Sequence, residues 1–318
     1  MIKKTCIILM IFILLFAAYL FNIFSNHNQY ISTFKSYVIT QKKISQELLT
    51  DYYSTHKNIQ QKAKHSIIST TLKNLEYEKW LPYMDYIDIL VYFSDVLPGN
   101  DQELIVALNL SKDVSVIAIY TKINNEYIFT NKIENLLPIQ NITFIKMPEL
   151  NYNSLITDQL LDERLGAFYI EEFIEIFTYV DTDFKSTWKK TKYSDEIFNL
   201  EWIDADASPK DWLKIVSKSD ITFNEKVPLT IDVSTHITKF KAISTKFPSL
   251  EEFKIIDQKN EQEKFYWDSK DQNFLPIKNT QSSNIAQDTN NLIQTFLGLK
   301  SNTYPVLPYE NQFQSSRR

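Results

Sequence analysis

The pattern of hydrophobic and polar positions changes three times along the chain. An uncharged apolar run covers residues 5–24, and apolar residues spaced by three and four follow from about 29 to 80, without proline or glycine. From 83 to 277 short β-rich runs alternate with polar links, and residues 278–318 form a polar tail, partly disordered by its composition. The chain is therefore expected to be α+β and mainly β, with a helical N-terminal part.

The apolar run 5–24 predicts a transmembrane helix. At about 1.5 Å per residue it roughly spans the ~30 Å hydrocarbon core of a bilayer. Lys3 and Lys4 precede it, and the next basic residue apart from His27 is Lys35. The positive-inside bias then leaves the N-terminus in the cytoplasm and the remainder outside.

A cleaved signal peptide is the alternative, but its apolar region is usually shorter, about 7 to 15 residues. Residues 1–26 are therefore predicted to be a cytoplasmic stub and an uncleaved single-pass anchor in the cell membrane. The lipid bilayer is the first predicted partner, through residues 5–24.

Residues 27–82 predict a helix that is either a stalk or an element packed on its own domain. Ile31, Phe34 and Val38 follow the helical spacing, but Gln41 and Ser45 interrupt the apolar seam. A coiled coil needs a cleaner heptad, which favours the packed helix.

Four β-rich runs from about Tyr86 to Ile133 predict a four-stranded antiparallel meander. The link Asn124-Asn125 suits a tight hairpin because asparagine tolerates a positive φ. The runs are YIDILVYFSD, QELIVALNL, VSVIAIYTKI and EYIFTNKI.

A second copy of the last hairpin follows 57 residues later, since VIAIYTKINNEYIFTNK begins at position 116 and FIEIFTYVDTDFKSTWK at position 173. The link Asn124-Asn125 falls on Asp181-Thr182, and the runs NITFIKMP and SLITDQL are expected to supply the first two strands of this unit. Residues 251–277 form a weaker third copy, read as three strands with two polar links. Repeated four-stranded units predict a partial propeller or a sandwich-like stack.

Helices are expected between the second and third units, near residues 194–217. Ser208 is placed as an N-cap, Pro209 as the first helical residue, and Asp211 near the positive end of the helix dipole. Asp204 and Asp206 are explained as acidic residues that lead into this helix.

Residues 94–110, SDVLPGNDQELIVALNL, place an acidic turn before an apolar strand. With the pair Glu103-Leu104, this stretch resembles the FG-GAP/VCBS-type repeats of bacterial surface proteins. The resemblance implies β-propeller blades and a calcium-binding loop. Calcium takes six to eight oxygen ligands, yet the alternate positions after Asp95 are Leu97 and Gly99. The loop is therefore degenerate, and no metal site is predicted.

Composition excludes several classes of protein. The three glycines, Gly99, Gly166 and Gly298, lie far apart, which rules out phosphate-cradling loops and the glycine-flanked serine elbow. Cys6 is the single cysteine, so neither an intrachain disulfide nor a cysteine-rich zinc site can form. The net charge of -5 gives no basis for nucleic-acid binding. No cofactor is predicted.

The longest charged link in the β region is DQLLDERLGAFYIEE, residues 158–172. Long charged loops on a rigid β scaffold are where binding sites gather, so Asp158, Asp162, Glu163 and Arg164 are the predicted binding residues. The alternative is a solvated loop with a surface pair between Asp162 and Arg164. No catalytic residue is predicted.

Large aromatic side chains could stack on sugar rings, but at strand positions they are expected in the core. The residues concerned are Trp188, Trp202, Trp212, Tyr266 and Trp267.

These observations predict a membrane-anchored extracytoplasmic module that binds a protein partner or a cell-envelope glycan, without catalysis. One alternative is an extracellular glycosidase-like hydrolase that uses two carboxylates of residues 158–172. Another is an accessory subunit of a membrane complex that contacts a second anchored chain through residues 29–80.

Overall fold

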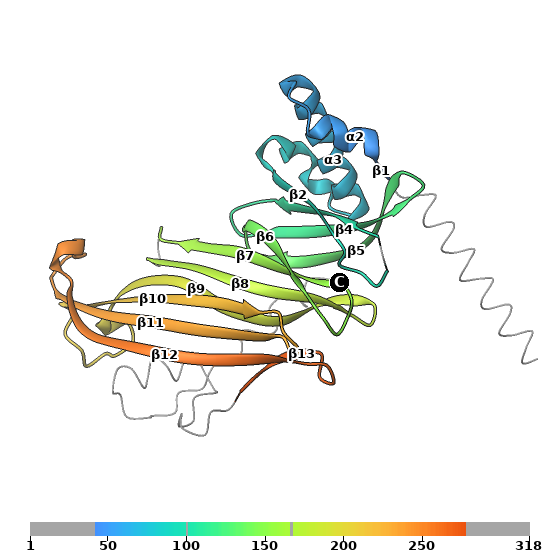
Figure 1. The fold of residues 1–318 in the computed structure, drawn as a ribbon. Coiled ribbons are helices and arrows are strands. Elements are labelled where there is room, and N and C mark those ends of the chain that lie inside the picture. Colours follow the sequence, from blue (N-terminus) through green and yellow to red (C-terminus); the bar gives the residue numbers. More distant parts are fainter. Residues whose placement is uncertain (1–41, 100, 166–167, 278–318) are drawn as a thin grey trace, which may run out of the picture. The chain divides into compact units, whose positions relative to one another are not determined.

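The structure is a computed structural model that describes residues 42–99, 101–165 and 168–277 (Figure 1). The predicted span 5–24 and the polar tail 278–318 lie outside the described residues. Among the residues that are described, no helix combines the length and the apolar character needed to cross a membrane. The described chain is mainly β and forms two antiparallel sheets, as the sequence predicts.

The first sheet has five strands in the order β1-β5-β4-β3-β2, and helices follow its short first strand. These elements are β1 (Ile44–Ser45), α2 (Gln46–Tyr52), α3 (Lys57–Asn74), the 3-10 helix η1 (Glu78–Tyr86), β2 (Asp88–Ser94), β3 (Glu103–Asn109), β4 (Ser115–Ile123) and β5 (Glu126–Leu136).

The second sheet has eight strands in sequential order from β6 to β13, several of them long and strongly curved (Figure 1). They are β6 (Ile139–Lys146), β7 (Asn153–Glu163), β8 (Tyr169–Val180), β9 (Asp183–Asn199), β10 (Asp211–Asn224), β11 (Thr230–Ile243), β12 (Lys254–Asp268) and β13 (Asn273–Pro276); the 3-10 turns are η2 (Leu200–Trp202) and η3 (Leu250–Glu252).

The single helix expected from 29 to 80 is broken in its described part. Ser45 is the N-cap of α2, and its side chain accepts the Leu48 N–H. The helix ends before residues 53–56, after which α3 begins. The break turns the chain so that both helices bury apolar residues against the first sheet, among them Leu49 and Ile67. The helices thus form a packed layer on that sheet.

The meander predicted from about Tyr86 to Ile133 is confirmed as β2 to β5. The runs in β3 and β4 are apolar without alternation because both faces are covered. Leu104 and Tyr120 pack with the helices, whereas Ile105 and Ile119 pack against the second sheet. The central strands are therefore buried on each side.

The predicted repeat is confirmed in strand pairing. Hairpin β4–β5 pairs Ile119 with Asn131, then shifts its register by a bulge; hairpin β8–β9 pairs Ile176 with Trp188 and shifts at the same point, 57 residues later (119 to 176). The links also agree, since Asn124 and Asp181 have φ values of 49° and 60°. A two-residue hairpin needs such positive φ values.

The first two strands of each unit correspond as well. Leu104 pairs with Phe93 and Tyr120, and Leu155 pairs with Phe144 and Phe177, so β2–β3 matches β6–β7. The two units also stack through opposite faces. Ile105, from the second face of the first unit, packs with Leu155, from the first face of the second unit.

The remaining strands differ from the prediction. Of the helices expected near 194–217, only the three-residue 3-10 turn η2 is present. The expected helix start is wrong, because Ser208 and Pro209 lie in the link between β9 and β10, and residues from Asp211 pair with β11 along 14 positions. The third copy is also wrong as read, because its first polar link lies inside the 15-residue strand β12, which pairs with β11. Pairing on both sides outweighs local helix-start signals.

The acidic turn before β3 is closed by Glu103 itself. Its buried carboxylate accepts the backbone N–H groups of Val96, at 2.9 Å, and Leu97, at 3.2 Å. Burial raises the pKa of Glu103 above its ordinary value. In the described part of the chain no group of three or more His, Cys, Asp or Glu residues is arranged to hold a metal.

Candidate functional site

The predicted binding residues do not lie in a loop. Asp158, Asp162 and Glu163 belong to β7, residues 169–172 belong to β8, and only a short hairpin turn that contains Arg164 joins the two strands. The loop expected at 158–172 is therefore corrected to an extended hairpin. Its length comes from the pairing of β7 with β8 as far as Glu163 and Tyr169.

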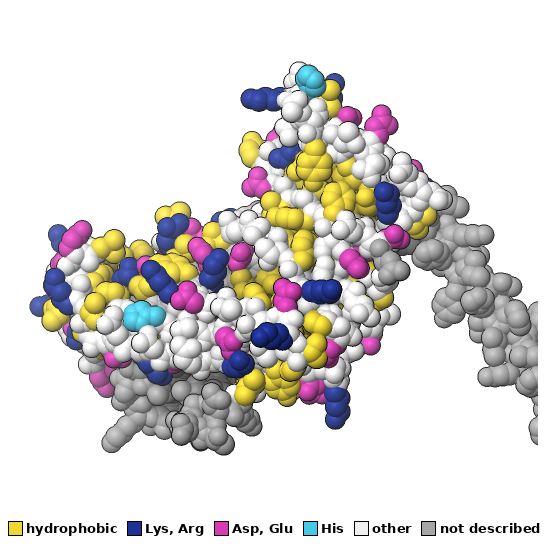
Figure 2. All heavy atoms as spheres, viewed as in Figure 1, with side chains coloured by type: hydrophobic (Ala, Val, Ile, Leu, Met, Phe, Trp, Pro, Cys, Tyr) yellow, Lys and Arg dark blue, Asp and Glu magenta, His cyan; other side chains and the backbone are white. Residues whose placement is uncertain are grey.

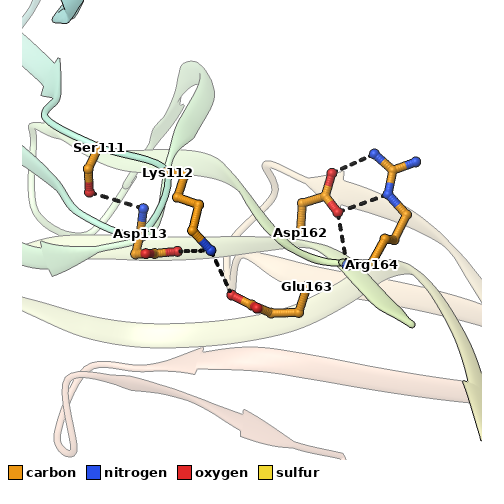
Figure 3. A network of polar contacts seen from close by, with 6 residues as sticks. All are labelled: Ser111, Lys112, Asp113, Asp162, Glu163 and Arg164. Atoms are coloured by element: carbon orange, nitrogen blue, oxygen red, sulfur yellow. Dashed lines mark hydrogen bonds and ion pairs between the residues drawn. The ribbon is translucent and has the colours of Figure 1, made fainter. Parts of the chain in front are cut away.

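The structure brings Asp162, Glu163 and Arg164 together at the end of this hairpin (Figure 3). Arg164 donates from Nε to the Asp162 carboxylate at 2.8 Å and from its backbone N–H at 3.2 Å. These hydrogen bonds lower the pKa of Asp162 to about 2. Asp162 is thus an exposed partner of Arg164, as in the alternative of a surface pair.

Glu163 contacts the first sheet through Lys112. The Lys112 ammonium lies 3.5 Å from the Glu163 carboxylate and 3.4 Å from Asp113, in the link between β3 and β4 (Figure 3). Asp158 lies elsewhere, on β7, with the Lys192 ammonium at 3.5 Å. The four predicted residues therefore do not form one cluster.

An aromatic chain runs beside the same hairpin. Phe168 contacts Phe247 at a ring-centroid distance of 4.4 Å, Phe247 contacts Trp212 at 5.4 Å, and Trp212 contacts Trp202 at 5.5 Å. Three of these rings come from connections, between β7 and β8, β9 and β10, and β11 and β12, and Trp212 lies at the start of β10. Three segments distant in sequence thus meet at one end of the second sheet.

Much of this end is apolar and exposed. Trp202 is 58% exposed, Phe247 47% and Leu250 65%, and Figure 2 shows hydrophobic side chains among charged ones at the left-hand end of the second sheet. We call this the tip surface and define it as Leu165, Phe168, Trp202, Ile203, Phe247 and Leu250.

Hydrogen bonds hold the three connections in place. In the connection between β7 and β8, the Phe168 carbonyl accepts the Ile197 N–H at 3.1 Å. The Trp212 indole N–H donates to the Ser244 carbonyl at 3.2 Å, and the Ser244 N–H donates to the Lys210 carbonyl at 2.8 Å. The Asn199 amide donates to the Pro209 carbonyl at 2.8 Å. A capping box between Ser249 and Glu252 closes the turn beside Phe247. The tip surface is therefore preordered.

The connection that contains Trp202 is acidic. The connection between β9 and β10 contains Glu201, Asp204 and Asp206 against one basic residue, Lys210. Asp204 accepts the Asp206 N–H at 3.1 Å, so its carboxylate stabilises this turn and leads into no helix. The rim of the tip surface is accordingly more acidic than basic on this side.

Sequence reasoning found only part of this surface. Trp188, Trp212 and Trp267 are buried, as expected, but the core expectation is wrong for Trp202. Phe168 and Phe247 were missed because nothing in the sequence indicates that their segments meet. The available signal was the presence of large aromatic residues inside otherwise polar links.

Comparison of the chain with protein-family models, curated protein sequences and solved structures finds no match.

Proposed function

We propose that this protein is a membrane-anchored extracytoplasmic module that binds a protein partner through the tip surface, with the apolar run 5–24 as its anchor. The proposal is carried by the exposed, hydrogen-bonded aromatic chain at one end of the second sheet. Interface centres are rich in Trp, Tyr and Phe, with polar rims that exclude water.

The preordered backbone supports recognition of a partner. A site whose loops are already fixed loses little conformational entropy when it binds. The Trp202 ring is exposed, whereas Trp212 is only 9% exposed. The two rings form an edge-to-face contact with an interplanar angle of 77°, so Trp212 packs against Trp202. An anchor residue on a rigid base is the arrangement expected of an interface hot spot.

The sequence resemblance to FG-GAP/VCBS-type repeats supports a proposal about the architecture of the protein. We propose that the two matching meanders are degenerate blades of the FG-GAP/VCBS type, which stack with the second face of one on the first face of the next, as Ile105 and Leu155 do. In this view Glu103 has a structural role, since its carboxylate is occupied by two backbone N–H groups.

The contacts of the 158–172 hairpin favour binding over hydrolysis by these carboxylates. A glycosidase acid needs a raised pKa, whereas the pKa of Asp162 is lowered to about 2 by Arg164. Glu163 and Asp158 each lie within 3.5 Å of a lysine ammonium. These contacts therefore support a role of the hairpin in binding rather than in proton transfer.

The experiment is co-purification of the tagged full-length chain from its own membrane, after crosslinking, with partners identified by mass spectrometry. Wild type is compared with Trp202→Ala/Phe247→Ala and with Tyr83→Ala, a matched aromatic control that is 54% exposed on η1. We expect one stoichiometric protein to be lost only from the double variant. Equal recovery from all three chains would refute a role for the tip surface, and retention on purified cell-wall polysaccharide that depends on Trp202 would identify a glycan instead.

A further inference from the structure

Strand β2 has a free edge in the described chain. It is the last strand of the five-stranded sheet and pairs only with β3, from Asp88–Asn109 to Ser94–Glu103. Its far end is covered, because the Asn153 side chain donates to Ser94 Oγ at 3.0 Å and the Asn153 N–H donates to the Asp95 carbonyl at 2.8 Å. The open part of the edge is therefore 88–93.

This edge lacks the residues that usually protect a sheet from further pairing. The sequence of β2 is DILVYFS, whose single charge is at its first residue, and it contains neither proline nor glycine. Strand β12 also has a free stretch, since β13 pairs only with its residues 265–268. That stretch is charged, with Lys254, Asp257, Lys259, Glu261, Glu263 and Lys264. Charged edges resist pairing, whereas an apolar edge invites it.

Packing on both faces fixes the position of this edge. Val91 and Phe93 pack against the helix-side core, and Leu90 and Tyr92 pack in the core between the sheets. Tyr53, which is 58% exposed, donates its hydroxyl to the Val91 carbonyl at 3.5 Å. A long hydrogen bond from an exposed side chain thus occupies an acceptor that an added strand would use.

The strand is complementary to itself in the antiparallel sense. With a two-fold axis at Val91, Ile89 faces Phe93 of the other copy and Leu90 faces Tyr92. The pairs in the open part thus run from Ile89 to Phe93, and the position opposite Asp88 is Ser94 at the covered end, so no like charges meet. Aromatic–aliphatic cross-strand pairs are favourable, and an isologous contact of this kind closes as a dimer.

From the free apolar edge, its fixed packing and this self-complementary pattern, we infer that β2 pairs antiparallel with β2 of a second copy of the chain, centred on Val91. The interface joins two five-stranded sheets into one continuous sheet. It is independent of the tip surface, because it uses a different sheet.

The test is thiol crosslinking of the full-length chain in its membrane, with Cys6 replaced by serine. Val91→Cys should form a disulfide dimer under mild oxidation, because paired Cα atoms lie about 5.5 Å apart, within the range that disulfides span. Ile89→Cys and Phe93→Cys should each crosslink poorly alone and efficiently when the two variants are coexpressed. Ser66→Cys, on the exposed face of α3, is the negative control.

Three results would overturn the inference. One is the absence of a Val91→Cys dimer in a chain that remains as protease-resistant as wild type. Another is a Val91→Cys adduct with a different protein, which would make β2 a docking edge for a heterologous strand. The third is equal crosslinking of Ile89→Cys alone and in the mixture, which would exclude the proposed register.

Discussion

Thr130 and Thr187 occupy the same bulge position in two hairpins of the chain. Thr130 donates to the Ile119 carbonyl at 3.2 Å, and Thr187 donates to the Ile176 carbonyl at 3.3 Å. Each threonine also contacts a second one across the hairpin, Thr121 at 3.3 Å and Thr178 at 3.0 Å. All these positions differ by 57, as 187 minus 130 does. The internal repeat thus extends to individual hydrogen bonds.

This pair gives a stability prediction with an internal control. Thr187 is buried, and Thr178 beside it also contacts Ser154 at 2.7 Å, whereas Thr130 is exposed. Thr187→Val should lower the free energy of unfolding by about 1–3 kcal/mol, because buried hydroxyls lose a partner. Thr130→Val should change it by less than about 0.5 kcal/mol. Urea unfolding of the full chain in detergent measures both, and equal effects would contradict the burial argument.

Glu103 gives a pH prediction. Burial raises its pKa from 4.5, so the folded state binds the proton more tightly than the unfolded state. This contribution to stability is fully present below pH 4.5 and is lost as the pH rises through the folded pKa. Relative to Glu103→Gln, wild type should therefore become more stable as the pH falls from 7 to 4.5.

Asp162→Asn is the control for this experiment. The pKa of Asp162 is lowered to about 2, so its contribution is present above its ordinary value of 3.8 and is lost only as the pH falls through about 2. Between pH 4.5 and 7 this variant should follow wild type. A wild-type stability that rises relative to Glu103→Gln toward pH 7 would show that the sign assigned to Glu103 is wrong.

Trp202 and Trp212 should respond differently to truncation. Trp212 is 9% exposed and contacts Trp202 and Phe247, so Trp212→Ala should cost about 3–5 kcal/mol. Trp202→Ala should cost less than about 1 kcal/mol, because its side chain is already largely in water. Thermal unfolding distinguishes them. A large loss for Trp202→Ala would mean that its ring serves folding rather than recognition.

The anchor prediction is tested by fractionation. The full chain should remain in the membrane after alkaline carbonate extraction, and a chain without residues 1–26 should be released. In intact cells a protease added outside should degrade the region after residue 26. Protection of that region in intact cells, with degradation after lysis, would reverse the predicted orientation.

Local patterns predicted the first two β units well. The alternation and continuous apolar runs around Asn124-Asn125 specify a hairpin through neighbouring residues, and the same pattern recurs 57 positions later, from 116 to 173. The segment from Ser208 to Asp211 misled because its helix-start residues are overruled by pairing of β10 with β9 and β11. Local propensity yields where long-range pairing buries the strand.

The tip surface could not be derived in the same way. Phe168 and Phe247 are 79 residues apart (247 minus 168), and their contact depends on how several long strands end together. The predicted residue Arg164 lies close to this surface in sequence, but the aromatic contacts beside it are tertiary. The sequence indicated a charged loop at 158–172, and only the fold identified its apolar neighbours.

The most direct test of the proposed function is site-specific photocrosslinking in the native membrane. A photoreactive amino acid is placed at Trp202, at Phe247, and at Tyr83 as the exposed control on η1. We predict that the first two positions yield an adduct with the same partner protein and that Tyr83 does not. No adduct at either tip position, or the same adduct from all three, would contradict the account.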